Sequence, residues 1–477
     1  MGLKKNLAYS TIQTLSTYLV PVLVFPLISR VLGPSNIGQI DTVESIMDFC
    51  ILFSMMGLTT LGVREIAKNK DDRQKLEQVF SDLFCINIIT TTVIIAVLGI
   101  LSFCIPFLIE HKKLVYIGML KILANMFWIE WFFKGIENFK YITIRSLIVR
   151  TIFVIAVYMF IRSREDVVLY YFLWVSVYLM NAICNWSFKS KYVRLRLRSA
   201  SVGRYFKAFF IIGVFSMLSA VYTQMNAPIL RMICGQDDQV AFYTISVRLY
   251  KVLIALFSTL TAVMIPRVSV MVKERAFDDI RSLITKSFTL LFFFSIPAIV
   301  FAELFAPDIV RVISGPGYEA AALPMRIVMF MLLIAGTEQI FILQLLIPAG
   351  RDKSIMYAGI CGVVVFLIAS VLLVRPLQSV GSALCWVLSE LTALSVSSIS
   401  VKRYYKIVFP WKLLLKLATA IIPYSLIGIL FLYLTDNFWI RVFGGFTAFV
   451  VCGIVLEIKV YKLGFVKTVI DKIRSYR

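Results

Sequence analysis

The stretch that decides the fold is residues 354–374, SIMYAGICGVVVFLIASVLLV, in which 21 uncharged residues lie between Lys353 and Arg375. A helix of about 20 apolar residues crosses the hydrocarbon core of a bilayer. About thirteen more apolar runs occur along the chain: the first begins near residue 7, and the others are centred near residues 50, 96, 124, 154, 177, 219, 254, 296, 335, 390, 424 and 449. The sequence therefore predicts an all-α, polytopic membrane protein with about 14 transmembrane helices.

The composition of the whole chain agrees with this prediction. Of the 477 residues, 60% are hydrophobic and 16% are charged, and the mean hydropathy is +0.87. Soluble domains are roughly 45–50% apolar and about 25% charged, so a soluble multidomain protein is excluded, as is a disordered chain. The single histidine, His111, lies in a short polar gap, and we expect it to be exposed. One histidine does not build a histidine-cluster metal site, so we predict no metal and no bound cofactor.

The formal net charge of +22 is distributed in a way that predicts topology. Lysine and arginine gather in alternate gaps between the apolar runs, as at residues 64–75, 189–207 and 267–286, whereas the intervening gaps hold few of them. Basic loops stay on the cytoplasmic side of a membrane. The pattern predicts an even number of spans with both termini cytoplasmic. The cations are not organised as a nucleic-acid patch, so we expect no nucleic-acid partner.

A faint internal repeat predicts the domain organisation. SRVLG at residues 29–33 ends the first span and LRMICG at 230–235 ends the seventh, about 202 residues later. We therefore predict two six-helix bundles, at 1–200 and 201–405, followed by an extra helix pair and a basic cytoplasmic tail at 406–477. Repeats of this kind place the substrate site between the halves near the middle of the membrane. The alternative is a chance match of two short segments.

Three acidic residues interrupt the second apolar run. Asp41, Glu44 and Asp48 are spaced by three and four residues, so they share one face of a helix. Each charge placed in lipid costs about 2.5–3.5 kcal/mol, so this face must look into protein or a watery cavity. One hypothesis is that these acids bind protons, a cation or polar groups of the substrate. The alternative is that the outer part of this helix is simply wetted.

Two basic residues occupy the eighth apolar run. Arg248 and Lys251 are three residues apart and need an anionic partner. That partner could be the acids of the second run, or a phosphate, which arginine binds bidentately and lysine binds as a point charge. A purely structural ion pair between the two halves is the alternative.

Further polar residues in apolar surroundings are candidates of lower rank. Glu130, Trp131 and Lys134 lie in an aromatic stretch that is typical of an interfacial belt, and flat aromatic rings could instead contact sugars. Glu338 and Glu390 lie inside the tenth and twelfth runs, where the sequence offers no partner for either.

Four stretches carry a resemblance to a known family: LISRVLGP at residues 27–34, GLTTLGVREIA at 57–67, EWFFKGIE at 130–137 and QLLIPAGRDK at 344–353. With them the chain resembles the bacterial oligosaccharide (polysaccharide repeat-unit) flippases, the O-antigen and capsule exporters of the multidrug/oligosaccharidyl-lipid/polysaccharide superfamily. The resemblance implies two bundles that open alternately to either side of the bacterial cytoplasmic membrane. It also implies a substrate made of an oligosaccharide on a polyprenyl diphosphate.

The predicted function is therefore translocation of such a lipid-linked oligosaccharide to the outer leaflet for surface polysaccharide synthesis. A diphosphate needs buried cations, and the available ones are Arg30, Arg231, Arg248 and Lys251. Coupling to H⁺ or Na⁺ is expected at the acids of the second run. Expected partners are membrane lipids, a polysaccharide polymerase and the chain-length machinery.

Other functions stay open. A cation-coupled drug exporter or a lipid II flippase of the same superfamily would share most of these features. A membrane enzyme should have a large external loop or a histidine-based site, and the sequence offers neither, so we predict that the protein is not an enzyme. A scaffold without transport would not need charges inside the second and eighth runs.

Overall fold

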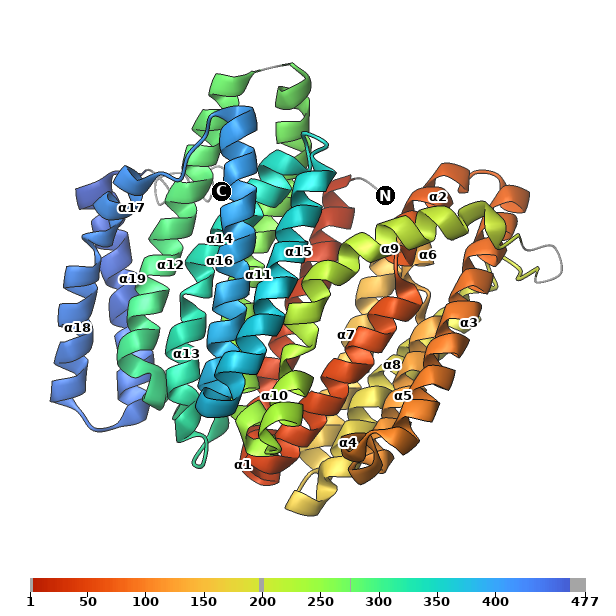
Figure 1. Cartoon of the computed structure of the whole chain (residues 1–477), viewed down its shortest axis with the longest axis horizontal. Helices are drawn as coiled ribbons and strands as arrows, with labels where there is room; N and C mark the ends of the chain where they lie inside the picture. The colour runs from red at the N-terminus through yellow and green to blue at the C-terminus, as the bar shows by residue number, and fades with distance from the viewer. Residues whose placement is uncertain (1–2, 197–200, 275, 464–477) are drawn as a thin grey trace. The chain divides into compact units, whose positions relative to one another are not determined.

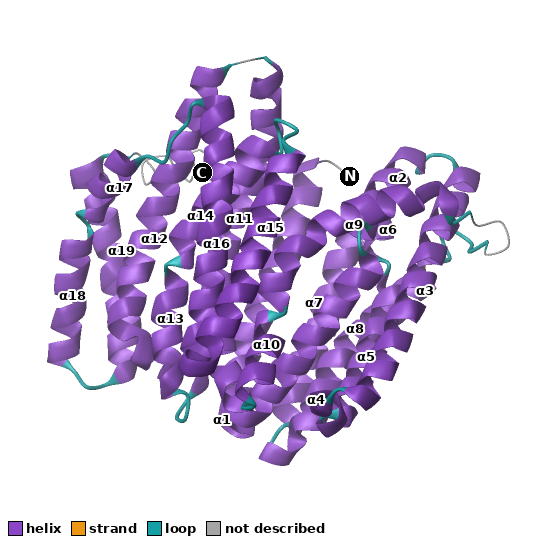
Figure 2. Cartoon of the chain, viewed as in Figure 1, coloured by secondary structure: helices purple, strands orange, loops and turns teal. Residues whose placement is uncertain are grey.

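The computed structural model describes residues 3–196, 201–274 and 276–463, and every secondary-structure element in these ranges is helical (Figure 1, Figure 2). The basic tail predicted after residue 463 lies outside the described residues. Eleven continuous helical stretches of the described chain are long and apolar enough to cross a membrane. The prediction of an all-α polytopic protein is confirmed.

Two of these stretches are too long for a single crossing. Tyr9–Asn69 has 61 residues and Asp352–Tyr405 has 54, whereas a bilayer core takes about 20 residues of helix. Each contains a residue with non-helical dihedral angles, Gly33 and Gln378 respectively. With these two stretches counted as two crossings each, the eleven stretches give thirteen crossings. The consecutive helices α9 (Gly203–Gln224) and α10 (Asn226–Cys234), taken together as one further crossing, bring the count to fourteen, the number predicted from the apolar runs.

The turn at Gly33 divides helix α1 (Leu3–Met55) into two arms. Gly33 has φ 80° and ψ 170°, a conformation that only glycine adopts without a steric penalty. Pro34 then starts the second arm, where its missing N–H costs no hydrogen bond. Figure 1 shows the first arm descending and the second returning beside other helices of the same unit. Gly235, the matching glycine of the predicted repeat, also has positive φ, at 71°.

Two compact units make up the chain, Met1–Ala241 and Phe242–Arg477. The first unit contains α1, α9, α10 and the following helices: α2 (Leu58–Asn69), α3 (Arg73–Cys104), α4 (Pro106–Glu110), α5 (Lys112–Trp128), α6 (Glu130–Gly135), α7 (Phe139–Phe160) and α8 (Val167–Lys189). Helix α11 (Asp237–Lys273) begins in the first unit and continues into the second. The finer division at residues 200 and 405 stays a prediction.

An aromatic core joins α2, α3 and α6 in the first unit. Phe80 and Trp131 stack with their ring centroids 5.6 Å apart, and Phe132 meets Phe80 edge-on at 5.2 Å. Gly62 lets α2 approach closely, because a Cβ there would lie only 2.6 Å from the ring of Trp131. These residues are almost completely buried, so this end of the unit is a packed core.

The second unit contains the remaining helices of the described chain. They are α12 (Phe277–Ser314), α13 (Ala322–Met329), α14 (Met331–Gln339), α15 (Asp352–Ala369), α16 (Arg375–Tyr405), α17 (Trp411–Ala418), α18 (Ile421–Leu434) and α19 (Gly445–Val455). A π-helical segment, η4 (Ile340–Leu346), follows α14 directly, and η5 (Ser370–Val374) joins α15 to α16.

The last helix pair packs against α12 through glycines. A Cβ at Gly428 of α18 would lie 2.3 Å from Leu304, and a Cβ at Gly445 of α19 would lie 3.3 Å from Phe305. Small residues at helix contacts let backbones approach in membrane proteins, where apolar burial alone gives no advantage over lipid. The predicted extra pair is therefore attached to the second unit by close packing.

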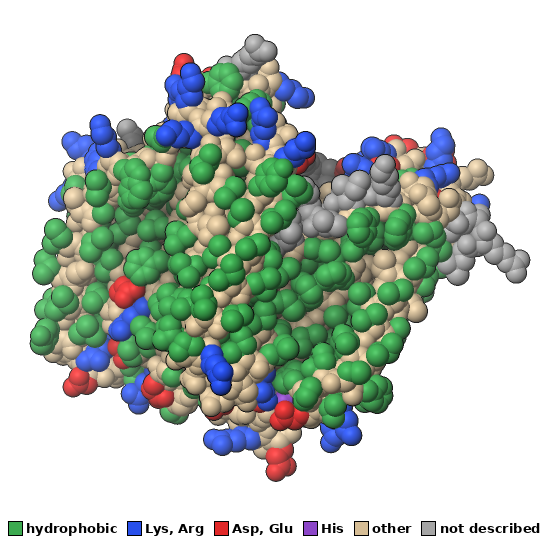
Figure 3. Space-filling view, viewed as in Figure 1, with side chains coloured by type: hydrophobic (Ala, Val, Ile, Leu, Met, Phe, Trp, Pro, Cys, Tyr) green, Lys and Arg blue, Asp and Glu red, His purple; other side chains and the backbone are tan. Residues whose placement is uncertain are grey.

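The outer surface of each unit is apolar along the middle of its helices. Figure 3 shows hydrophobic side chains covering these middles, with Lys, Arg, Asp and Glu mostly near helix ends. Large side chains such as Phe103 in the first unit and Leu426 and Phe446 in the second are 58–75% exposed. Exposed apolar surface on this scale is typical of a lipid-facing belt.

Candidate functional site

A cluster of charged side chains lies inside the first unit, between α1 and α5. The Nζ atom of Lys121 is 2.5 Å from Oε1 of Glu44 and 2.6 Å from Oδ1 of Asp48. The two acids are four residues apart on the second arm of α1, so they share one helix face. The side chain of Lys121 is completely buried, whereas those of Glu44 and Asp48 are 18% and 37% exposed. We call these three residues the Lys121 cluster.

Aromatic side chains of α8 surround the Lys121 cluster. The hydroxyl of Tyr171 donates to Oε2 of Glu44 at 3.1 Å, and Nε1 of Trp174 donates to Oε1 at 2.6 Å. The Lys121 ammonium lies 4.7 Å from the ring centroid of Tyr178, which favours a cation–π contact. Glu44 is therefore held by three donors, and its carboxylate is fixed in position.

The charges of the Lys121 cluster do not balance. One ammonium faces two carboxylates, so the cluster carries a net charge of −1 when all three groups are ionised. Charges inside a membrane are costly and usually mark a functional pathway. Asp48 is the most exposed member of the cluster within the structure. The geometry can hold one further positive charge, a proton or a monovalent cation, at Asp48.

The sequence predicted three acids on one face, and the structure brings two of them together. Asp41, one to two turns before Glu44 and Asp48, is half-buried and does not form an ion pair with Lys121. The lysine that holds the other two was missed. Its signal was present, because Lys121 is the one charged residue in the apolar run of residues 114–128, and an isolated charge in a span needs a partner.

A continuous series of contacts leads from the Lys121 cluster to Glu130. Tyr178 meets Trp128 edge-on with ring centroids 4.9 Å apart, and the backbone carbonyl of Trp128 accepts a hydrogen bond from Asn185. Asn185 also accepts from Arg145, whose guanidinium lies 3.5 Å from Oε2 of Glu130. Polar contacts therefore run along the interface of α5, α7 and α8 inside the first unit.

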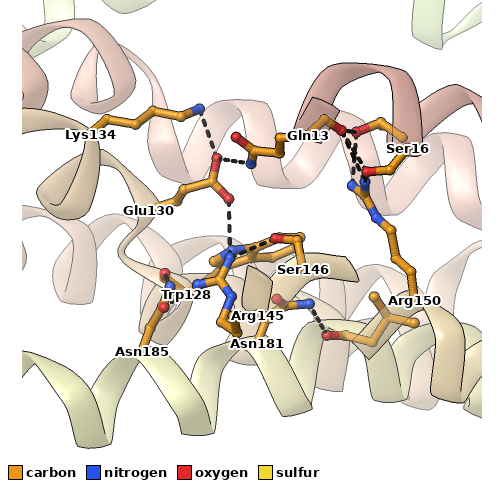
Figure 4. A network of polar contacts seen from close by, with 12 residues as sticks. Gln13, Ser16, Trp128, Glu130, Lys134, Arg145, Ser146, Arg150, Asn181 and Asn185 are labelled. Carbon is orange, nitrogen blue, oxygen red and sulfur yellow. Dashed lines mark hydrogen bonds and ion pairs between the residues drawn. The ribbon is translucent and has the colours of Figure 1, made fainter. Parts of the chain in front are cut away.

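Glu130 is the centre of a second polar network, drawn in Figure 4. Its Oε1 accepts from Nε2 of Gln13 at 3.0 Å and lies 2.8 Å from Nζ of Lys134, while Arg145 contacts Oε2. The side chain of Arg145 is 4% exposed and also donates to Ser146. Glu130 is therefore paired with two cations, Lys134 and Arg145.

Arg150 attaches the first arm of α1 to α7. Its guanidinium donates to the backbone carbonyl of Gln13 at 3.2 Å, to the hydroxyl of Ser16, and to the hydroxyl of Thr17 at 2.8 Å (Figure 4). Gln13 also contacts Glu130, so α6 and α7 both hold this arm. The arrangement fixes the position of α1 within the first unit.

Several buried polar atoms along this interface have no hydrogen-bond partner in the described chain: Nδ2 of Asn125, Nε1 of Trp128, Nε of Arg145 and Oδ1 of Asn181. The amide nitrogen of Asn181 donates to Val177 within its own helix at 2.6 Å, as Figure 4 shows. An unpaired buried polar atom destabilises a fold by about 1–3 kcal/mol.

The interpretation of residues 128–133 as an interfacial belt or a sugar platform is wrong for Trp131, Phe132 and Phe133. All three are at most 2% exposed and belong to the core between α2, α3 and α6. The sequence could not distinguish a belt from a core, because both consist of aromatic residues at the end of a span.

The two predicted phosphate ligands of the first unit, Arg30 and Arg231, differ in their exposure and in their partners. Arg30 is exposed and donates to the backbone carbonyl of Pro26 at 2.7 Å. Arg231 is engaged at 2.5 Å with Asp237 and at 3.3 Å with Glu110. A phosphate would have to displace these carboxylates from Arg231.

His111 lies beside Arg231 and is buried, at 9% exposed, so the expectation of an exposed loop residue is wrong. Its Nε2 is 3.8 Å from Glu110 and 4.0 Å from Asp237, and its ring meets Phe107 edge-on. Burial lowers the pKa of His111, Asp237 and Glu110 partly oppose that shift, and Arg231 adds to it.

In the second unit, the predicted cations lie on α11. Arg248 is partly buried and Lys251 is exposed. The predicted ion pair between these cations and the acids of the second apolar run would join the two units and stays a prediction.

Glu338 and Glu390 come together in the second unit. Glu338 of α14 is 9% exposed and Glu390 of α16 is 7% exposed, and the two carboxyl groups are close enough to hydrogen-bond. Nε1 of Trp386 donates to Oε1 of Glu390 at 3.3 Å. The sequence showed no partner for either glutamate. In the structure each is the neighbour of the other, although 52 positions separate them in the chain.

Comparison with known proteins identifies the family. The model of the family described as "Polysaccharide biosynthesis protein" matches residues 3–272, more than half of the chain. The chain belongs to this family. A similar protein from Escherichia coli (strain K12), named "Putative O-antigen transporter", is 22% identical over 415 residues, which cover 84% of this chain and 97% of that protein. A protein of the same name from Shigella dysenteriae is 21% identical over 170 residues, covering 35% of this chain and 41% of that protein.

Solved structures share the fold of this polysaccharide biosynthesis protein. The lipid II flippase MurJ, in an inward closed conformation, has a TM-score of 0.76 at 15% identity, covering 95% of this chain and all of that one. A multidrug resistance MATE transporter of the MOP superfamily, facing inward, has a TM-score of 0.67 at 15% identity, with coverage of 83% and 94%. The polysaccharide biosynthesis protein is a multi-pass membrane protein, and the proteins that it resembles are transporters and flippases rather than enzymes. The family resemblance is confirmed.

Proposed function

We propose that the protein is a flippase that moves polyprenyl-diphosphate-linked oligosaccharide repeat units from the cytoplasmic to the outer leaflet by alternating access, for O-antigen or capsule synthesis. The observation that carries the proposal is the match over 84% of the chain to a relative named as an O-antigen transporter. The fold shared with a lipid II flippase supports a lipid-linked substrate. The buried, unbalanced charges of the Lys121 cluster support a transport role, because a scaffold would not need them.

The substrate's diphosphate requires cations on its path. We assign this role to Arg30, Arg231, Arg248 and Lys251. Arg30 and Lys251 are exposed. Arg231 takes part only if it exchanges its carboxylate partners for phosphate oxygens, which guanidinium groups bind with the same bidentate geometry.

Coupling to H⁺ or Na⁺ is the second part of the proposal. The acids Asp41, Glu44 and Asp48 are its site in the first unit. The net charge of −1 in the Lys121 cluster favours uptake of one positive charge, and the 37% exposure of Asp48 supports access. The protein works in the cytoplasmic membrane with both termini cytoplasmic, among membrane lipids and beside a polysaccharide polymerase and chain-length machinery.

Transport by purified protein tests this function. Vesicles containing the protein and a polyprenyl-diphosphate oligosaccharide are exposed to an external glycosidase, which reaches sugars of the outer leaflet only. With a flippase, all of the glycolipid becomes accessible within the assay time, whereas protein-free vesicles protect about half of it. Protection at the protein-free level, with folded protein in the vesicles, would overturn the proposal.

A second candidate is a cation-coupled drug exporter or a lipid II flippase, which the structural similarity to the MATE transporter and to MurJ favours. The same vesicles separate these functions when lipid II or a fluorescent cationic drug replaces the oligosaccharide. Movement of the drug without movement of the glycolipid would support the exporter.

A further inference from the structure

The two buried glutamates of the second unit form an isolated acidic pair. Glu338 lies on α14 and Glu390 on α16, both more than nine-tenths buried, with their carboxyl groups within hydrogen-bonding reach. Neither carboxyl forms an ion pair with a lysine, arginine or histidine of the described residues. The pair therefore differs from the Lys121 cluster, where an ammonium separates the two acids.

The groups around the pair are polar but uncharged. Trp386 donates its indole N–H to Oε1 of Glu390 at 3.3 Å, and Oε2 of Glu390 is buried without a donor in the described chain. Tyr250 faces both carboxyl groups from α11 and meets Trp386 edge-on with ring centroids 5.2 Å apart. The carboxyl pair thus has one N–H donor and one unsatisfied oxygen.

The elements packed against α14 and α16 carry few charged residues near the pair, and on α11 the nearest in the chain to Tyr250 are Arg248 and Lys251. Arg326 of α13 lies 4.0 Å from Glu303 of α12. Helix α15 carries charges only at its first two residues, Asp352 and Lys353, and η4 carries none. Tyr250 lies close enough to both acids to interact with them electrostatically.

The negative charges of the two glutamates determine whether the pair binds a proton or a metal cation. Two carboxylates in contact cannot both ionise in a low-dielectric environment, and such pairs share one proton. A metal cation would need several oxygen ligands, and the described residues contain no group of three or more metal-binding side chains. The indole N–H on Oε1 is also a donor, which a bound cation would oppose.

We propose that Glu338 and Glu390 form a proton-binding site of the second unit, in which one carboxyl group donates its proton to the other at neutral pH. The proton fills the gap left at the unsatisfied oxygen. Its release leaves two negative charges in contact, so α14 must move away from α16 or a cation must enter. The π-helical segment η4 begins at Ile340, two residues after Glu338, and π-helical turns often occur at functional sites.

The binding of this proton does not depend on the substrate. The further claim, that uptake and release of this proton accompany transport, rests on the function proposed above. The two claims are tested separately, because proton binding is measured on purified protein without glycolipid.

Infrared spectroscopy of the full-length protein with ¹³C-labelled glutamate tests the site. A protonated glutamate gives a carbonyl band that an ionised one lacks. The wild type should show this band at pH 7 and lose it only at higher pH. Glu338→Gln and Glu390→Gln should each shift its midpoint down by about 1–3 pH units, because the amide N–H then serves as the donor to the remaining carboxylate.

Glu77→Gln is the matched control. Glu77 is 3% exposed but lies 2.7 Å from the guanidinium of Arg196, so it is paired with a cation rather than with another acid, and its removal should leave the band unchanged. Absence of a protonated glutamate in the wild type at pH 7 would overturn the proposal whether or not the variants fold. So would a band that both Gln variants leave unshifted, or one that Na⁺ abolishes at constant pH.

Discussion

The Nζ atom of Lys121 lies 2.6 Å from Oδ1 of Asp48, although 73 positions separate the two residues in the chain. The lysine side chain is completely buried and the aspartate side chain is 37% exposed. The contact connects the inside of the first unit to its accessible surface. It also explains how an acidic helix face is tolerated in an apolar span, because the lysine offsets most of the cost of burying the acids.

Replacing Lys121 by Met should destabilise the protein strongly. The change leaves Glu44 and Asp48 without their cation, and breaking a buried ion pair by removing one partner costs about 3–5 kcal/mol. Thermal unfolding in detergent measures the effect. Lys134→Met is the control, because Lys134 is 42% exposed beside Glu130 and such pairs contribute at most about 1 kcal/mol. Equal losses in the two variants would contradict the burial argument, and adding Glu44→Gln to Lys121→Met should restore part of the stability.

Replacing Arg150 by Leu should loosen the first arm of α1. The change removes donors to the carbonyl of Gln13 and to the hydroxyls of Ser16 and Thr17. Hydrogen–deuterium exchange should rise in residues 9–17 with little change in α8. Arg162→Leu is the control. Arg162 is exposed, and its replacement should leave hydrogen–deuterium exchange in the first arm unchanged. Unaltered protection of the arm in the Arg150 variant would show that packing alone holds it.

Replacing Asn181 by Leu should cost little stability. Its Oδ1 is buried without a partner in the described chain, and removing an unsatisfied polar atom is close to neutral or stabilising. Asn87→Leu should cost about 1 kcal/mol or more, because Asn87 accepts from Thr91 at 3.2 Å and donates to the carbonyl of Met126 at 3.4 Å. Unfolding of the two variants under identical conditions gives the comparison. A larger loss for Asn181→Leu would mean that ordered water satisfies its oxygen.

The stability of the protein should fall on acidification through the titration of His111. Burial lowers the pKa of His111 from its usual value of 6.5, so between that value and the lower folded-state pKa the unfolded chain binds more protons than the folded one. Stability therefore decreases as pH falls below about 6.5 and levels off below the folded pKa. His111→Gln should flatten this part of the curve of melting temperature against pH. An identical slope in the variant would exclude His111 as its cause.

Replacing Arg248 or Lys251 by Ala should abolish glycan export while the protein remains in the membrane. The loss is expected if these cations bind the diphosphate, because burying a phosphate without a cation beside it is strongly unfavourable. Surface polysaccharide and the amount of protein in membranes are measured together. Lys402→Ala is the control. Lys402 is exposed near the end of α16, and cells with this variant should export the glycan normally. Normal export by both variants would refute the phosphate role.

The number and order of the membrane spans could be predicted from local sequence. Uncharged runs such as residues 354–374 are long enough to cross a bilayer, and the alternation of basic gaps predicts an even count. The turn at Gly33 was also readable, because glycine followed by proline at the end of a span is incompatible with a continuing helix. These features depend on residues that are close in the chain.

The partners of the buried charges could not be predicted in the same way. The sequence placed Asp41, Glu44 and Asp48 on one face, but neither Lys121 as the cation for two of them nor the contact between Glu338 and Glu390 was foreseen. Trp131 was interpreted as interfacial and is a core residue. Each of these outcomes depends on how helices from distant parts of the chain rotate and pack against one another.

Sequence alone therefore determined that this chain is an all-helical membrane protein and which family it resembles, because hydropathy and short motifs are local properties. The tertiary structure decided which intramembrane charges are neutralised and which are not. One lysine separates the acids of the first unit, whereas the two glutamates of the second unit face each other without a cation. The physical reason is that the cost of a buried charge depends on the partner within a few ångströms, and helix packing chooses that partner.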